Sequence, residues 1–236
     1  MRFSSLMLLV ALVGCGETGQ RVISYDAVSV GDAAPFVVGN WTITLTNAKL
    51  GLGPLYFCAT ASASADLCPA AVNELADVVT IDLLSSTPTH FGTIRGTTGS
   101  IRSVTFDYGI TWFTTQIAAT PFPTAPDGHS LVLAGHAEAG GAQPQAYDFA
   151  GTVDIAPQFA GSLVMQGYAA VETVTTDQLQ LVATLRPADI LREVDFDALA
   201  AHPVIAPGDD AHNAITTALT TVGGPVFSWV SLAGAK

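Results

Sequence analysis

The sequence predicts a mainly β fold, an antiparallel β-sandwich of about ten short strands with two or three short helices. Residues 41–46 alternate strictly between apolar residues and threonines, which is typical of a strand with one buried face. Similar short segments recur along the chain, and loops rich in Gly, Pro and Thr separate them. A hydrophobic fraction of 49% against 12% charged residues provides enough apolar side chains for a core.

The expected strands follow one another from residue 22 onward. Asn47 is expected to interrupt the first clear strand, and Gly109 indicates a bulge or tight bend between two others. We expect strands at residues 41–46, 55–57, 78–84, 101–108, 110–117, 130–137, 146–155, 159–171, 178–185 and 226–232.

Three segments carry helix signals. Residues 69–77 begin with Pro69, which a first helical turn tolerates. Residues 187–200 also begin with a proline, and their apolar residues recur at helical spacing. A third helix is expected to start at Asp209 or Asp210 and to run to about residue 222, because aspartate is favoured at helix N-caps. The two late helices are expected to cover an end or an edge of the sandwich.

The N-terminus has the pattern of an export signal. Arg2 precedes an apolar run at residues 3–13, which is too short to span a bilayer because that takes about 20 apolar residues. The run ends in the sequence Leu-Val-Gly-Cys at residues 12–15, which resembles the lipobox of bacterial lipoproteins. The resemblance implies that residues 1–14 are a removed signal peptide and that Cys15 carries a lipid anchor. An ordinary secretory signal is the alternative.

A lipid on Cys15 would place the protein in the bacterial cell envelope. The residue after the cysteine is Gly16 and not an aspartate. In lipoproteins of this type that favours the outer membrane, so the resemblance implies attachment there. Residues 15–21 are polar and contain glycine, and we expect them to be a tether. Residues 22–236 are expected to form a single β-sandwich domain.

The sequence contains three cysteines, and the anchor would use one of them. Cys58 and Cys68 would then remain in an oxidising compartment, where a disulfide between them is expected. Such a bridge would close a short loop rich in Ala and Ser and contribute about 2–3 kcal/mol to stability. A soft metal site is the alternative, but it needs more ligands than the nearby sequence offers.

The formal net charge of −12 argues against one class of partner. With 20 acidic side chains and only 8 Lys and Arg, the protein is expected to repel phosphate backbones and to bind no nucleic acid. The sequence also lacks a G-x-S-x-G elbow, a Walker loop, a G-x-G-x-x-G turn and an H-E-x-x-H helix. We therefore expect no catalytic residues and no obligatory cofactor.

One loop carries candidate metal ligands. Asp209, Asp210 and His212 stand close together and could hold Zn²⁺, Cu²⁺ or Ca²⁺. The alternative is that one aspartate caps the following helix while the other side chains are solvated. His129 and His136 are seven residues apart, so a regular strand would point them to opposite faces.

A binding face is a further possibility, because threonines and tryptophans can form one on a sheet. Trp41 and Trp229 lie in alternating segments and are expected in the core, whereas either Trp112 or its neighbour Phe113 must face outward. The threonines that could form an exposed surface are Thr42, Thr44, Thr46, Thr111, Thr114 and Thr115.

Several stretches resemble an uncharacterised group of lipoproteins from myxobacteria-like species. They are residues 41–57, 81–88, 135–155, 185–199 and 213–229. This resemblance implies no activity. The sequence as a whole predicts a lipid-anchored, non-enzymatic envelope protein with a binding or structural role and an unidentified protein or glycan ligand. The alternatives are a metal-binding periplasmic lipoprotein and a cell-envelope hydrolase.

Overall fold

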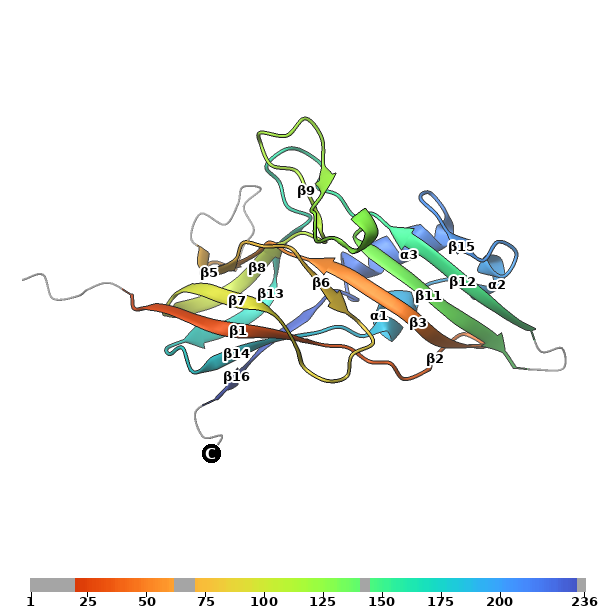
Figure 1. Cartoon of the computed structure of the whole chain (residues 1–236), viewed down its shortest axis with the longest axis horizontal. Coiled ribbons are helices and arrows are strands. Elements are labelled where there is room, and N and C mark those ends of the chain that lie inside the picture. The colour runs from red at the N-terminus through yellow and green to blue at the C-terminus, as the bar shows by residue number, and fades with distance from the viewer. Residues whose placement is uncertain (1–19, 62–70, 141–144, 233–236) are drawn as a thin grey trace, which may run out of the picture.

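The computed structural model describes residues 20–61, 71–140 and 145–232, and it confirms the predicted mainly β fold. Two large sheets share one continuous core, and a small two-stranded ribbon projects from them (Figure 1). Within the described ranges there are more strands than the sequence predicts, because several predicted strands are split or joined by short ones. Two of the strand pairs are parallel, so the sandwich is not purely antiparallel.

Sheet I is the eight-stranded sheet. Its strands, in spatial order, are β13 (Met165–Val174), β8 (Gly99–Phe106), β4 (Leu55–Cys58), β5 (Ala71–Leu75), β7 (Thr89–Thr97), β1 (Val22–Val30), β14 (Leu179–Thr184) and β16 (Val226–Ser231). All pairs within it are antiparallel except β1 with β14.

Sheet I curls so that its two edge strands, β13 and β16, approach each other. Aromatic rings fill the space inside the curl. The ring of Phe227 on β16 lies 5.7 Å from that of Phe57, 5.8 Å from that of Phe106 and 6.5 Å from that of Tyr168 on β13, all edge to face. Trp229 adds a further edge contact to Phe57, at 5.5 Å. Because each large ring buries a wide apolar surface, this cluster holds the curled sheet together.

Sheet II packs beside sheet I. Its strands, in spatial order, are β15 (Val204–Ile205), β12 (Gln145–Val153), β11 (Leu131–Ala139), β3 (Trp41–Leu52) and β2 (Phe36–Val38), and β6 (Val79–Asp82) also pairs with β3. Strand β3 buries Trp41 and Ile43 and exposes the intervening Thr42 and Thr44, as the alternation predicts. The predicted interruption at Asn47 is wrong: the strand continues past it, because a bulge lets both flanks keep their pairing to β11.

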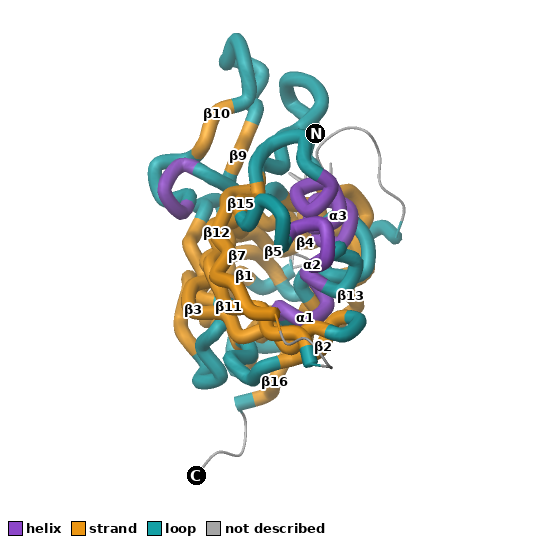
Figure 2. The backbone as a smooth tube through the Cα atoms, turned by 90° about the vertical axis from the view of Figure 1, so that its right-hand side faces the viewer, coloured by secondary structure: helices purple, strands orange, loops and turns teal. Residues whose placement is uncertain are grey.

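Three helices cover the inner face of sheet II (Figure 2). They are α1 (Pro187–Leu191), α2 (Phe196–Leu199) and α3 (Asp210–Leu219). The Phe196 ring of α2 lies 5.5 Å from that of Phe149 on β12, and the indole Nε1 of Trp41 donates to Asp197 Oδ1 at 2.9 Å. Trp41 is therefore in the core, as predicted, with its polar atom satisfied.

The predicted helix over residues 69–77 is wrong where the structure describes it, because β5 occupies Ala71–Leu75. This strand pairs with β4 on one edge and with β7 on the other. Its Asn73 is buried, donates to Thr97 O at 3.1 Å and accepts from the Tyr25 hydroxyl at 3.2 Å. Pairing on both edges outweighs the local helix preference, which is a weak term.

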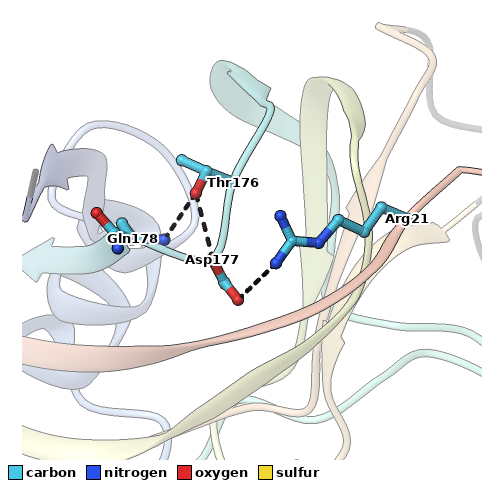
Figure 3. A network of polar contacts seen from close by, with 4 residues as sticks. All are labelled: Arg21, Thr176, Asp177 and Gln178. Atoms are coloured by element: carbon cyan, nitrogen blue, oxygen red, sulfur yellow. Dashed lines mark hydrogen bonds and ion pairs between the residues drawn. The ribbon is translucent and has the colours of Figure 1, made fainter.

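The start of β1 is held by a surface network (Figure 3). Arg21 pairs with Asp177 at 3.0 Å, and Thr176 donates to the same aspartate at 3.3 Å, in the turn between β13 and β14. The amide N–H of Gln178 donates to the Thr176 hydroxyl at 3.2 Å. Both partners of the ion pair are well exposed, so it contributes under about 1 kcal/mol. The pair links the start of β1 to the turn between β13 and β14.

A close crossing of two strand ends positions the projecting loops. Gly109 follows β8 with a φ of 81° and lies against Gly51 of β3. A Cβ on Gly109 would stand 3.2 Å from the Gly51 Cα and 3.3 Å from the Ala125 Cβ. The predicted bend at Gly109 is therefore confirmed, and only glycine fits there without strain.

We expect Gly109→Ala to destabilise the protein by about 1–3 kcal/mol, because alanine resists a positive φ and its methyl group would crowd Gly51. Urea unfolding followed by far-UV circular dichroism measures the change. The matched control is Gly140→Ala, since a Cβ there meets nothing within 4 Å. If Gly109→Ala and Gly140→Ala lower the free energy of unfolding equally, the Gly51–Gly109 crossing does not constrain packing.

Candidate ligand-binding site

Two loops project together from one end of the molecule, at the top of Figure 1. The first covers residues 110–125 and contains β9 (Ile110–Thr111) and β10 (Thr120–Pro121), and the second covers residues 155–164. We call them together the two-loop end. The amide of Gly161 in the second loop donates to Trp112 O in the first at 2.6 Å. The loops therefore support each other and do not stand alone.

The sequence predicts strands across most of these loops, and the structure corrects both predictions. Strand β9 stops at Thr111 where the sequence suggested a strand to residue 117. Strand β13 starts at Met165 where the sequence suggested a start at residue 159. Both segments are largely apolar and the first contains several threonines, as strands often do, but no neighbouring strand is placed to pair with them over their full length.

A cavity of about 80 Å³ lies at the base of the two-loop end. The cavity is lined by three aromatic residues, Tyr56, Trp112 and Phe113, and by one carboxylate, that of Asp107. The remaining lining residues are Thr111, Thr114, Gly161, Ser162 and Leu163. Residues from β4, β9, the second loop and the end of β8 thus meet around one small space.

Asp107 is fully buried, at 0% exposure. Its Oδ1 accepts from the amide of Val164 at 2.7 Å, which ties the second loop to the end of β8. Its Oδ2 is buried and has no hydrogen-bond partner. The ion pairs found in the described part of the chain do not include Asp107. A buried carboxylate with an unpaired oxygen is costly, so its position beside a cavity is informative.

Strand alternation explains why this aspartate lies outside the aromatic core. Phe57 and Phe106 face the inside of the curl, so their sequence neighbours Tyr56 and Asp107 face the opposite side of sheet I. Ser103 and Thr105 continue the same polar row along β8 and are also buried. The outer face of β8 is therefore polar but covered, and Asp107 ends the row at the cavity.

Burial changes the acidity of this group. Loss of hydration raises the pKa of Asp107 from its ordinary 3.8 to about 7, and the hydrogen bond from Val164 acts in the opposite direction. Burial also raises the pKa of Tyr56, and the negative charges of Glu74 and Asp107 raise it further. The cavity therefore holds a carboxyl that titrates near neutral pH and a tyrosine that stays protonated.

A larger groove lies on the other side of the second loop. It has a volume of about 580 Å³, and Ser162 and Leu163 line both it and the small cavity. Thr216 and Thr220 of α3 form its far wall, and the hydroxyl of Thr216 is buried without a partner. The second loop is thus a partition with a hollow on each side.

The rim of the two-loop end is apolar and uncharged. Residues 110–126 and 155–166 contain no Asp, Glu, Lys, Arg or His. Ile117 is 100% exposed, and Phe113 and Phe159 are 43% and 53% exposed. Exposed apolar side chains gathered on two contacting loops are typical of an interaction site. Of the adjacent pair Trp112 and Phe113, it is Phe113 that faces solvent.

The three predicted metal ligands have different surroundings. Asp209 is the N-cap residue of α3, but its side chain turns back to accept from the amide of Ala206 at 3.0 Å. Asp210 is exposed, whereas both ring nitrogens of His212 are buried without a partner. Among the residues that the structure describes, no group of three or more His, Cys, Asp or Glu could hold a metal ion. The metal site at these three residues stays a prediction.

Two histidine–aspartate pairs lie on sheet II. His129 Nδ1 is 2.8 Å from Asp154 Oδ1, and His136 Nδ1 is 2.8 Å from Asp148 Oδ1. Such pairs orient the imidazole in serine hydrolases, but Ser130 beside His129 is buried, and its hydroxyl bonds the backbone of Ile155. The chemistry predicted for a hydrolase is not assembled by these residues.

Other predicted residues have varied positions. Thr42, Thr44 and Thr46 are exposed on β3, but Thr111 is buried at the cavity. Cys15 and Cys68 lie outside the described residues, so the lipid anchor and the Cys58–Cys68 disulfide stay predictions. No helix in the described ranges is long and apolar enough to cross a membrane.

Sequence reasoning missed Asp107. The available signal was an aspartate in an otherwise alternating strand, immediately before a tyrosine and the Gly109 bend. An outward-facing aspartate is normally solvated, so nothing local indicated that two distant segments would bury it.

We expect Asp107→Asn to stabilise the protein at pH 8 and to leave its stability almost unchanged at pH 4. Because the folded pKa is about 7 and the unfolded one near 3.8, only the folded state holds the proton between these values. Stability therefore falls as pH rises through this window, by up to about 4 kcal/mol. Urea unfolding from pH 4 to pH 8 measures the slope that the variant should lose.

The exposed Asp77→Asn change is the matched control, and it should not alter the pH dependence by this amount. A parallel loss of slope in both variants would contradict the buried-carboxylate origin.

Comparison with known proteins adds little. No family model matches the chain, and no curated protein matches it. One solved structure, MbnP from Methylosinus trichosporium, is similar with a TM-score of 0.41 and 13% identity, covering 91% of this chain and 100% of that chain. No property of that protein is carried over at this level of similarity.

Proposed function

We propose that this protein is a non-enzymatic binding protein of the bacterial cell envelope, anchored by a lipid on Cys15, which takes its ligand at the two-loop end. The observation that carries the proposal is the buried carboxylate of Asp107, whose Oδ2 has no partner and which lines a cavity. Perturbed and unsatisfied groups of this kind concentrate at functional sites.

The arrangement favours recognition over structural stabilisation. An unpaired buried carboxylate lowers the stability of the fold, and replacing it with a neutral side chain would relieve that cost. A ligand that satisfies Oδ2 would recover the lost energy as binding energy. The surrounding aromatic residues supply apolar contact area, and the exposed rim of Phe113, Ile117 and Phe159 extends it outward.

The residues of the cavity suit binding better than catalysis. Its lining offers one carboxyl and one tyrosine as titratable groups, and Ser162 already donates to Phe159 O at 2.7 Å. Nucleophilic catalysis needs a general base beside a free hydroxyl. General acid–base catalysis by a pair of groups needs a second titratable group whose pKa lies near neutral pH.

The proposed anchor rests on the sequence of residues 12–15. The Arg21–Asp177 pair lies at the start of β1, directly after the expected tether in the sequence. In Figure 1 the start of β1 and the two-loop end point in different directions, which would leave the loops accessible on an anchored molecule. A Cys58–Cys68 disulfide, proposed here as well, would form in the same oxidising compartment.

The binding role is tested by blocking the cavity. We expect a library of small cationic, anionic and neutral compounds to contain ligands that change tryptophan fluorescence, because Trp112 lines the cavity whereas Trp41 lies in the core and Trp229 packs against it. Thr114→Trp should abolish the response, since Thr114 is an exposed lining residue and a larger side chain there would fill the mouth. Because the added tryptophan also fluoresces, binding of the same ligands to this variant is measured by calorimetry.

Thr87→Trp is the matched control, because Thr87 is an exposed threonine on a distant turn. Binding that survives in Thr114→Trp and is equally strong in Thr87→Trp would place the ligand elsewhere. A library without any ligand would end the proposal.

The anchor is tested in cells. We expect Cys15→Ser to move the protein from the membrane fraction to the aqueous fraction, because the thiol that would accept the lipid is removed. Gly16→Asp is the control, since it keeps the cysteine and should keep membrane attachment. A Cys15→Ser protein that stays in the membrane fraction would refute the anchor.

A further inference from the structure

The ligand class can be narrowed from the chemistry of the cavity, on the assumption that the proposed binding function is right. Asp107 Oδ2 is an acceptor without a donor, and the group carries a negative charge above neutral pH. No Lys, Arg or His side chain of the described residues pairs with it. The group that satisfies it best is a hydrogen-bond donor with a positive charge, because charge-assisted hydrogen bonds are the strong ones.

The rest of the lining distinguishes an organic cation from a metal ion. Calcium takes six to eight oxygen ligands, and transition metals take several nitrogen, oxygen or sulfur ligands. The cavity offers a single carboxylate, and Tyr56, Trp112 and Phe113 add ring surfaces. Aromatic faces attract ammonium and guanidinium groups through their quadrupole, and the attraction grows when the cation is desolvated.

The volume limits the size of the cation. A cavity of about 150 Å³ lined by apolar side chains holds benzene, so 80 Å³ has room for about half as many heavy atoms. That is an ammonium nitrogen with two or three carbons. A guanidinium group with its stem, or a quaternary ammonium with a larger substituent, would exceed this space.

The field of the whole protein favours the same sign. With 20 acidic residues against 8 Lys and Arg, the molecule attracts cations from a distance. The two-loop end itself is uncharged, so no local positive charge opposes the approach to Asp107.

We propose that the Asp107 cavity binds a primary alkylammonium group, which donates to Asp107 Oδ2 and lies against the rings of Tyr56 and Trp112. The group could belong to a free short-chain amine or to the end of a lysine side chain on a partner. The exposed apolar side chains of Ile117 and Phe159, which do not line the cavity, would add contacts only in the second case.

The test uses the full chain with Cys15→Ser, purified, and propylammonium chloride as the probe. Calorimetry and Trp112 fluorescence are measured at pH 8 with sodium chloride matched in concentration. We expect saturable binding of propylammonium, little binding of the neutral isostere 1-propanol, and none of propionate. Asp107→Asn should weaken the binding of propylammonium by at least about tenfold, while its folding is checked by circular dichroism.

Two further probes separate the sources of the ammonium group. A peptide with one lysine between apolar residues should bind more tightly than propylammonium if a partner lysine is the ligand, and N-acetylation of that lysine should abolish binding. Equal affinity of peptide and propylammonium would indicate a free amine. Either result supports the ammonium site.

Equal binding of propanol and propylammonium, or unchanged binding to Asp107→Asn, would overturn the inference. If a neutral or anionic compound binds and Thr114→Trp blocks it, the binding function stands and only the ligand class is wrong. If no compound of any class binds, the inference and the proposed function both fail.

Discussion

The edge-to-face packing of aromatic rings inside sheet I is the interaction on which the rest of the structure depends. Phe57, Phe106, Tyr168 and Phe227 come from four strands, and their contacts bring the two edges of the sheet together. Without these ring contacts little apolar surface would be buried between β13 and β16, and the sheet would stay open. Rings are suited to the task because each one fills a large volume in a defined rotamer.

The same strands carry the candidate site on their other face. Side chains alternate along a strand, so fixing Phe57 and Phe106 inward fixes Tyr56 and Asp107 outward. The amide of Val164, just before β13, then reaches Asp107 Oδ1. The position of the carboxylate is therefore a consequence of core packing, and the second loop adds one hydrogen bond to it.

Burying Asp107 has a cost in folding free energy. One oxygen is satisfied by Val164 and the other is not, so the group raises the energy of the folded state whenever it is ionised. The neighbouring loops contact each other and the Gly51–Gly109 crossing lies at their base, and Asp107 beneath them is fully buried. A site that is organised before the ligand arrives loses less entropy on binding, and this favours a preformed cavity beneath the two-loop end.

The sequence by itself determined the class of the fold, because strand and helix periodicities are local. The alternation at residues 41–46 placed Trp41 and Ile43 inward, and the proline and aspartate signals located the late helices. Only the tertiary structure decided which segments pair. Residues 71–75 became a strand because both edges found partners, and residues 112–117 and 159–164 became loops because theirs did not. The burial of Asp107 is of the same kind: it depends on residues about fifty positions away on both sides, and no local pattern records that contact.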